Sequence, residues 1–273
     1  MDTRVGVAAT GLLVAAMRAE ESASDAPLFT DPFAERLAGD EGRGLLADAK
    51  AATGNASGQI VIRTRYWDEA LLRANADGVT QVVILAAGMD ARAYRLPWQA
   101  NTTVYEIDQA AVMSLKGDRL AGETPRCRRV ALGVDLADDW PKTLLSRGFD
   151  SSAKSVWLVE GLLQYLDAEA VDALFDRVDT LSAPDSVLLY ETVGRTLLEA
   201  PFLQPTLDFM KNLDAPWIYG TDEPANLVQS RGWSAAVTDI AEPGNAWHRW
   251  DQPPVPLDVQ GVPRGYFIRA KKA

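Results

Sequence analysis

Short apolar runs recur through the middle of the chain, each followed by residues whose apolar positions repeat at helical spacing. Val171, Leu174 and Val178 belong to one such helical set, which follows an apolar run ending at Val159. Strands that alternate with helices predict an α/β fold with a parallel sheet. We expect strands at residues 81–86, 103–107, 129–134, 155–159, 186–190, 235–238 and 265–270, and a helix at 167–181.

The N-terminal part of the chain lacks this alternation and is expected to be helical. Residues 5–17 have the apolar character of an export signal, but they are too short to span a bilayer. The charged residues that follow favour an amphipathic helix instead. Pro32 is expected at the first position of a short helix, and residues 59–76 place their apolar side chains near one helical face.

The pattern changes again after residue 191. The stretch 194–220 is longer than an ordinary connection between two elements, and aromatic residues alternate with prolines along it. We therefore expect an inserted helical lid there. A helix from Thr221 to Gly232 should follow, and residues 247–263 should form an irregular loop rich in Trp and Pro.

The most informative stretch joins two of the expected strands. The apolar run 82–85 ends at Ala86-Ala87-Gly88, and the next run leads to Asp108, 20 residues after Gly88. A strand, a turn of small residues and a later acid are how a doubly wound sheet binds a nucleoside. Small residues let the ligand approach the backbone, and the carboxylate accepts hydrogen bonds from the ribose.

Two cofactors contain such a nucleoside, a nicotinamide dinucleotide and S-adenosylmethionine. The turn holds one glycine rather than the G-x-G-x-x-G of dinucleotide sites, and Asp90 would repel a diphosphate. None of the tyrosines has a lysine four residues later, as a short-chain dehydrogenase would. A sulfonium ligand without phosphate fits better. The turn therefore favours a methyltransferase over a dehydrogenase.

Composition narrows the classes of partner. The net charge is −11 and the isoelectric point about 4.7, which argues against a nucleic acid partner. The single cysteine, Cys127, excludes an internal disulfide and fits a reducing, cytoplasmic location. The chain has one histidine, His248, in addition to this one cysteine. We therefore expect no metal site. We expect a small-molecule partner and no membrane partner, and the sequence does not indicate the oligomeric state.

Five motifs follow one another between residues 84 and 194: ILAAGMDARAYRLPW, VYEID, VDLADDW, WLVEGLLQYL and LLYETVG. With ATGLLVAAMRAEES and LFTDPFAERL before them, they resemble the leucine carboxyl methyltransferase family from about residue 5 to about residue 192. That family includes bacterial enzymes that methylate carboxyl groups of aromatic polyketides of the tetracenomycin type. The resemblance implies a class I S-adenosylmethionine-dependent methyltransferase.

The fold that the resemblance implies is doubly wound and Rossmann-like, with seven strands. We expect a single domain with four parts. They are a helical cap at residues 1–78, a cofactor-binding core at 79–193, a lid at 194–222, inserted after the fifth strand, and the C-terminal part of the sheet at 223–273.

The resemblance also assigns residues to the cofactor. Arg63 should bind the methionine carboxylate, because a guanidinium meets a carboxylate with two hydrogen bonds. Glu160 should face the methionine amino group. Asp108 should hold the ribose, and Glu106, on the same strand face, is the alternative.

Four further positions are assigned to the same ligand. Ala86 and Gly88 should lie beneath the cofactor, where eukaryotic relatives have glycine in place of Ala86. Asp135 and Leu136 should hold the adenine edge. Alternatively, Asp135 caps the helix that follows it.

The acceptor implied by the resemblance is the carboxyl group of a small aromatic or polyketide acid, in secondary metabolism such as antibiotic biosynthesis. A carboxylic acid is ionised at neutral pH and needs no general base, whereas a phenol usually does. The scarcity of histidine fits a carboxylate. Hydroxyl methylation, methylation of a protein C-terminal carboxyl and binding without chemistry are the alternatives. Candidate catalytic residues are Tyr190, Glu191 and His248, of which the first two should shape the acceptor site.

A buried acceptor carboxylate needs a cation or several donors. Arg195, Arg249 and Arg264 are candidates by position. The aromatic side chains of the expected lid would suit a flat polycyclic acceptor, or they pack into a small core of the lid itself. They are Phe202, Phe209, Trp217 and Tyr219.

Overall fold

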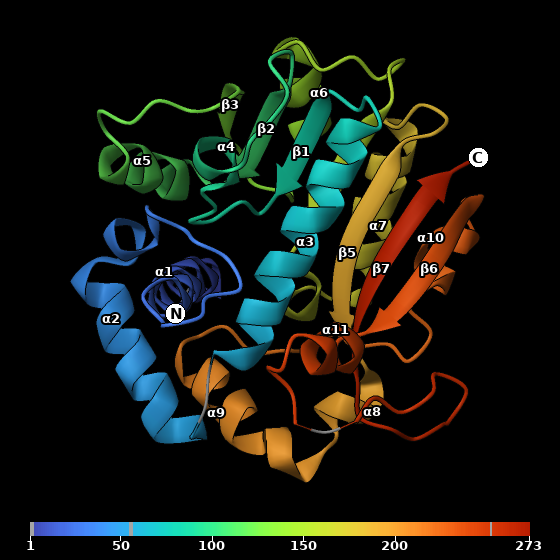
Figure 1. The fold of residues 1–273 in the computed structure, drawn as a ribbon. Helices are drawn as coiled ribbons and strands as arrows, with labels where there is room; N and C mark the ends of the chain where they lie inside the picture. The colour runs from blue at the N-terminus through green and yellow to red at the C-terminus, as the bar shows by residue number, and fades with distance from the viewer. Residues whose placement is uncertain (1–2, 55–56, 252) are drawn as a thin grey trace.

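A seven-stranded sheet runs through the middle of the computed structural model, which describes residues 3–54, 57–251 and 253–273 (Figure 1). The strand order is β3-β2-β1-β4-β5-β7-β6, and neighbours from β3 to β5 are parallel. Strand β7 runs antiparallel to β5 and to β6. The strands are β1 Gln81–Leu85, β2 Thr103–Asp108, β3 Arg128–Gly133, β4 Ser155–Val159, β5 Val187–Val193, β6 Trp233–Asp239 and β7 Gly265–Lys272.

Alternation along the strands divides the interior into two cores. Val82 and Ile84 of β1 face one side of the sheet, and Val83 and Leu85 face the other. The first core packs against the N-terminal helices and the second against α6 and α7. The helices that flank the sheet are α4 Arg92–Arg95, α5 Ala110–Arg119, α6 Trp140–Ser146, α7 Ala168–Thr180, α10 Asn226–Gln229 and α11 Ala241–Ala246, and η1 Leu163–Tyr165 is a short 3-10 helix.

The helical N-terminal part is confirmed. It consists of α1 (Thr3–Ser22), α2 (Ala34–Thr53) and α3 (Gly58–Ala76), and Figure 1 shows α1 and α2 side by side next to α3. A Cβ on Gly42 would lie 2.6 Å from the carbonyl oxygen of Leu12, so a glycine permits this close approach of the two helices. Of the described helices, none is both long and apolar enough to cross a bilayer.

Two helix predictions differ from the structure. Pro32 lies in a turn just before α2 rather than at its first position, and the first segment of α2 is short as expected, because the non-helical backbone at Gly39 divides Ala34–Thr53 there. The helix expected from Thr221 to Gly232 is confined to α10, Asn226–Gln229. Pro224 lies in the predicted first turn, and a proline disfavours helical backbone in the residue before it.

The stretch after β5 contains short helices, as the pattern predicted. They are α8 (Arg195–Leu198), η2 (Pro201–Leu203) and α9 (Gln204–Asn212). Helix α9 packs against α2, at the bottom of the view in Figure 1. The two segments are about 150 residues apart in sequence, and together they form one end of the molecule.

Candidate functional site

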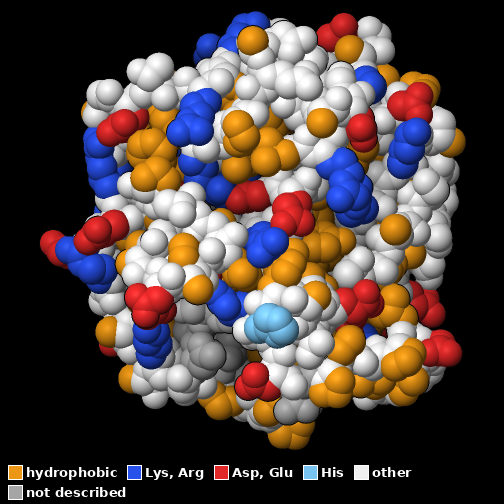
Figure 2. Space-filling model, in the orientation of Figure 1, with side chains coloured by type: hydrophobic (Ala, Val, Ile, Leu, Met, Phe, Trp, Pro, Cys, Tyr) orange, Lys and Arg blue, Asp and Glu red, His pale blue; other side chains and the backbone are white. Residues whose placement is uncertain are grey.

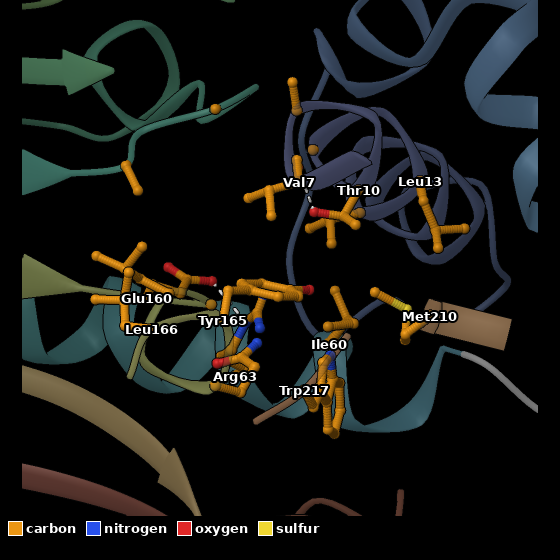
Figure 3. Close-up of a pocket in the computed structure, with 18 of the residues that line it drawn as sticks. Val7, Thr10, Leu13, Ile60, Arg63, Glu160, Tyr165, Leu166, Met210 and Trp217 are labelled. Carbon is orange, nitrogen blue, oxygen red and sulfur yellow. Dashed lines mark hydrogen bonds and ion pairs between the residues drawn. The ribbon is translucent and has the colours of Figure 1, made fainter. Parts of the chain in front are cut away.

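A cavity of about 1130 Å³ opens at the carboxyl ends of β1 to β4, with α1 on its opposite side (Figure 3). This edge is where ligands bind in open α/β sheets. Its lining has a charged part and an apolar part. The charged half is formed by Arg18, Arg63, Asp90, Asp108, Asp135, Glu160 and Arg177 with the turn after β1, and the apolar half by Leu13, Val14, Met17, Ala49, Ile60, Leu203, Phe209, Met210, Trp217 and Trp250.

The turn after β1 has the conformation that small residues permit. Ala86 has φ of 52° and Gly88 has φ of 46°, both in the left-handed region. This backbone is natural for glycine and costs an alanine about 1 kcal/mol. Ala86 therefore keeps the backbone path expected of a glycine, and both residues line the cavity.

Asp108 ends β2 beside this turn. Its carboxylate accepts hydrogen bonds from the backbone N–H groups of Gly88 (2.6 Å) and Gln109 (2.7 Å). Burial raises the pKa of Asp108, against the effect of these two bonds. Glu106, the alternative at this position, is fully buried and pairs with Lys116 at 2.8 Å and Arg129 at 2.7 Å. It does not line the cavity, so that alternative is wrong.

Arg63 lies between two carboxylates. Its Nε is 2.8 Å from Glu160 and its Nη1 is 2.8 Å from Glu191. Glu191 also accepts a hydrogen bond from the N–H of Gly161, whose φ is +65°. Burial would lower the pKa of Arg63, but the two carboxylates raise it. Arg63 also lines the cavity.

Arg92 extends this pairing beneath the cavity. It contacts Asp90, Asp68 (2.7 Å) and Glu160 (2.6 Å), and its side chain is only 3% exposed. Burial would raise the pKa of Glu160, but Arg92 and Arg63 lower it. Burial would also raise the pKa of Asp90, but the charge of Arg92, with those of Lys116 and Arg18, lowers it to about 2.

A second row of ion pairs continues from Asp68. Arg95 contacts Asp68 at 2.5 Å and Asp31 at 3.8 Å, and Arg18 contacts Asp31 at 3.1 Å. Arg18 lines the cavity and also donates to the carbonyl of Met89. Sequence reasoning missed this network, although the spacing of Asp90, Arg92 and Arg95 in one motif was a signal of it. Buried charges of both signs must pair.

The opposite end of the charged half is formed by residues after β3. Asp135 accepts a hydrogen bond from the N–H of Ala137 at 2.9 Å, and both line the cavity with Leu136. The cap of α6 is Asp139, whose side chain accepts from the N–H of Lys142. The alternative role of Asp135 as that cap is therefore wrong.

The charged half fits S-adenosylmethionine. It contains a carboxylate at the end of β2, the guanidinium of Arg63 and a backbone edge at 135–137. Seven carboxylate side chains and four arginines line the whole cavity among the described residues, an excess of negative charge that suits a sulfonium and opposes a diphosphate.

The apolar half receives only some of the expected acceptor residues. Phe209, Trp217 and Arg249 line the cavity. Phe202 is 69% exposed and Tyr219 packs on the core behind the sheet, so neither lies in the lining. Arg249 donates to Glu21 at 3.1 Å and to the carbonyl of Ala26 at 2.6 Å.

The candidate catalytic residues lie outside the lining. Tyr190 is fully buried and donates to the carbonyl of Pro224 at 2.7 Å, and burial raises its pKa. Glu191 lies behind Arg63. His248 lies on the surface, where Figure 2 shows it in pale blue.

Two further arginines that sequence position suggested also point elsewhere. Arg195 is exposed and outside the lining. Arg264 is buried and pairs with Asp239 at 2.5 Å. Within the described part of the chain, no group of three or more potential metal ligands comes together.

The sheet order and this site together define a class I S-adenosylmethionine-dependent methyltransferase. The model of the leucine carboxyl methyltransferase family matches residues 11–179, and the chain belongs to that family. Its cofactor is S-adenosylmethionine.

Two relatives are similar in sequence to nearly the whole chain. A protein from Mycolicibacterium smegmatis is 45% identical over 279 residues, which cover 95% of this chain and 93% of the relative. One from Mycobacterium avium is 36% identical over 302 residues, covering 97% and 95%. Both are provisionally named S-adenosyl-L-methionine-dependent methyltransferases.

Solved structures share the fold at low identity. A provisionally named methyltransferase from Thermobifida fusca has a TM-score of 0.63 at 18% identity, over 86% of this chain and 90% of that one. A DUF574 family protein from Streptomyces avermitilis has a TM-score of 0.65 at 12% identity, over 97% of each chain. These likenesses concern the architecture alone.

Proposed function

We propose that this methyltransferase transfers the methyl group to the carboxylate of a small acid and forms a methyl ester. One observation carries the proposal. The two halves meet around Tyr165, and the ionisable side chains labelled there in Figure 3 are Arg63, Glu160 and Tyr165 itself. Burial raises the pKa of Tyr165 above its usual value near 10, and the pKa values of Arg63 and Glu160 also move away from neutrality.

None of these three groups changes its protonation near neutral pH, so none is suited to remove a proton from a phenol or alcohol. A carboxylate acceptor arrives already ionised. Membership of the leucine carboxyl methyltransferase family supports the same choice. An aromatic or polyketide acid of secondary metabolism would match the aromatic lining of the apolar half.

In the proposed arrangement Arg63 holds the methionine carboxylate through Nη2, and Glu160 faces the amino group. Asp108 accepts hydrogen bonds from the ribose, while Asp135 and Leu136 hold the adenine edge. S-adenosylmethionine supplies a methyl group on a positively charged sulfur. A carboxylate oxygen of the acceptor forms the new O–CH₃ bond as the S–CH₃ bond breaks, which leaves a neutral thioether and an ester and releases no proton.

The protein's work in this scheme is positioning. Holding two reactants in line is equivalent to effective molarities of up to about 10⁵–10⁸ M. The buried pairs around Arg63 and Arg92 fix the donor end without moving a proton. The apolar half excludes water from the acceptor oxygen, which would otherwise be strongly hydrated.

The test compares matched acceptors that differ in the group to be methylated. Purified protein is incubated with methyl-labelled S-adenosylmethionine and either naphthoic acid or naphthol, and the product is treated with alkali. We expect labelled product from the acid, and we expect alkali to release the label as methanol, as it does from an ester. Labelled, alkali-stable product from naphthol alone would favour hydroxyl methylation and overturn the proposal.

A further inference from the structure

Trp217 places an unusual group in the lining of the cavity. Its indole Nε1 is buried and has no hydrogen-bond partner of good geometry among the described residues. A buried donor without a partner costs free energy, and each one in a native structure calls for an explanation. Because Trp217 lines the cavity, a bound ligand can supply the missing acceptor.

The Tyr165 hydroxyl lies close to this indole. Burial raises the pKa of Tyr165, and hydrogen bonding of its hydroxyl with Trp217, Thr10 and Gln164 lowers it only in part, so the hydroxyl stays protonated. Figure 3 shows the hydroxyl pointing between Thr10 and Ile60, away from Glu160. Thr10 already donates its own proton to the carbonyl of Val7 at 2.6 Å. The indole N–H and this hydroxyl therefore lie next to each other in the lining, so that one ligand oxygen could accept hydrogen bonds from both.

The space beyond these donors has an apolar lining. Leu13, Ile60 and Met210 surround it in Figure 3. The one arginine on this side, Arg249, is held by Glu21 and by the carbonyl of Ala26. A second charge on an acceptor would therefore meet no free partner here among the described residues, and burying it would be costly.

We propose that the acceptor is an acid with a single carboxylate and an otherwise apolar body, and that Trp217 Nε1 and the Tyr165 hydroxyl hold the carboxylate. This inference rests on the proposed function and names the substrate class of the same site. Neutral donors can bind one carboxylate oxygen and leave the other oxygen free to attack the methyl group. A guanidinium that hydrogen-bonds to both carboxylate oxygens would make both of them less nucleophilic.

The first test removes one donor at a time. Binding of decanoic acid and of naphthoic acid is measured by calorimetry in the presence of S-adenosylhomocysteine, in wild type, Trp217→Phe and Tyr165→Phe. Each variant keeps an aromatic ring and loses a donor, so we expect about tenfold weaker binding of whichever acid binds. The affinity for S-adenosylhomocysteine should not change.

The control is Trp247→Phe, at a half-buried tryptophan that does not line the cavity. It should bind both acids as wild type does. Binding of decanol separates loss of a donor from loss of packing, because poorer packing would weaken the binding of decanol and decanoic acid alike. Wild type should prefer decanoic acid to decanol, and that preference should shrink in Trp217→Phe and Tyr165→Phe. An unchanged preference in both variants would overturn the donor pair.

The second test concerns the body of the acid. Sebacic acid has the chain length of decanoic acid and a carboxylate at each end. We expect it to bind at least about tenfold more weakly than decanoic acid, because its second charge would be buried without a partner. Equal binding of the two, or binding of neither decanoic nor naphthoic acid, would overturn the substrate class.

These failures differ from failure of the proposed function. If alkali-labile ester forms while Trp217→Phe and Tyr165→Phe bind acids normally, the function stands and the donor pair is wrong. If only hydroxyl acceptors are methylated, the function itself is wrong.

Discussion

The two halves of the cavity differ in how their side chains are arranged. The charged half consists of buried ion pairs, in which Arg63 and Arg92 each contact two or more carboxylates. The apolar half consists of uncharged side chains from α1, α2, α3, η2 and α9 and of Trp217 and Trp250. The first is defined by specific partners and the second by shape. We therefore expect single substitutions to have large, specific effects in the charged half and graded effects in the apolar half.

Removing Arg92 tests most strongly whether the buried ion pairs stabilise the charged half. Asp68, Asp90 and Glu160 would lose a buried partner, so the Arg92→Ala variant should lose about 3–5 kcal/mol of unfolding free energy in urea denaturation. The matched control is Arg43→Ala, whose ion pairs are exposed and should contribute at most about 1 kcal/mol. Similar losses in the two variants would show that the buried network does not stabilise the charged half.

Asp108 tests the ligand-binding role of the same half. If Asp108 accepts hydrogen bonds from the ribose, as proposed, Asp108→Ala should bind S-adenosylmethionine about 100-fold more weakly, measured by calorimetry. Asp118→Ala, an exposed acid on the nearby helix α5, is the control and should bind normally. Normal binding by a folded Asp108→Ala variant would remove Asp108 from the site.

The pH dependence of stability follows from Asp90. Its pKa is about 2 in the folded protein against an ordinary value of 3.8, so the carboxylate stabilises the fold above about pH 4. That contribution, about 2 kcal/mol, is lost as the pH falls toward 2. Urea denaturation of wild type and Asp90→Asn should give a difference that closes between about pH 5 and pH 2. A constant difference would contradict the pairing of Asp90.

Two phenylalanines of the same segment test the apolar half. Phe209 lines the cavity, whereas Phe202 is 69% exposed and does not. Phe209→Ala should raise the KM for naphthoic acid about tenfold with unchanged cofactor affinity, because it removes buried apolar area. Phe202→Ala should leave both constants unchanged. Equal effects would mean that the acceptor does not occupy this half.

The smallest effect is expected at His248. It lies on the surface outside the cavity, so His248→Ala should leave kcat within about twofold of wild type. Steady-state kinetics with naphthoic acid would measure this. A loss of kcat by about 100-fold or more, the usual worth of a general base, would make His248 a base after all.

Much of the fold could be predicted, since strand positions depend on local apolar runs. The expected strand at 155–159 matches β4, and the others differ by a few residues at their ends. Pro32 and Pro224 were misjudged, because their effects depend on where the helix begins. The antiparallel pairing of β7 with β5 and β6 depends on long-range packing that no local pattern records.

In the site, too, residues that belong to a local sequence pattern could be predicted, and residues brought together by long-range contacts could not. Ala86, Gly88 and Asp108 could be found because a nucleoside site requires small residues and an acid at a fixed spacing. Arg18 and Asp68 could not, because their roles arise from ion pairs between distant segments. Tyr165 and Trp217 converge from η1 and from the stretch after α9. Only the folded chain brings their donors to one point.

The most direct test is the pH profile of kcat/KM for methylation of naphthoic acid between about pH 6 and pH 9. If the acceptor arrives ionised and no side chain at the junction removes a proton, the profile should be flat across this range. A profile that rises about tenfold per pH unit would mean that a proton must leave before methyl transfer, and it would contradict the carboxylate account.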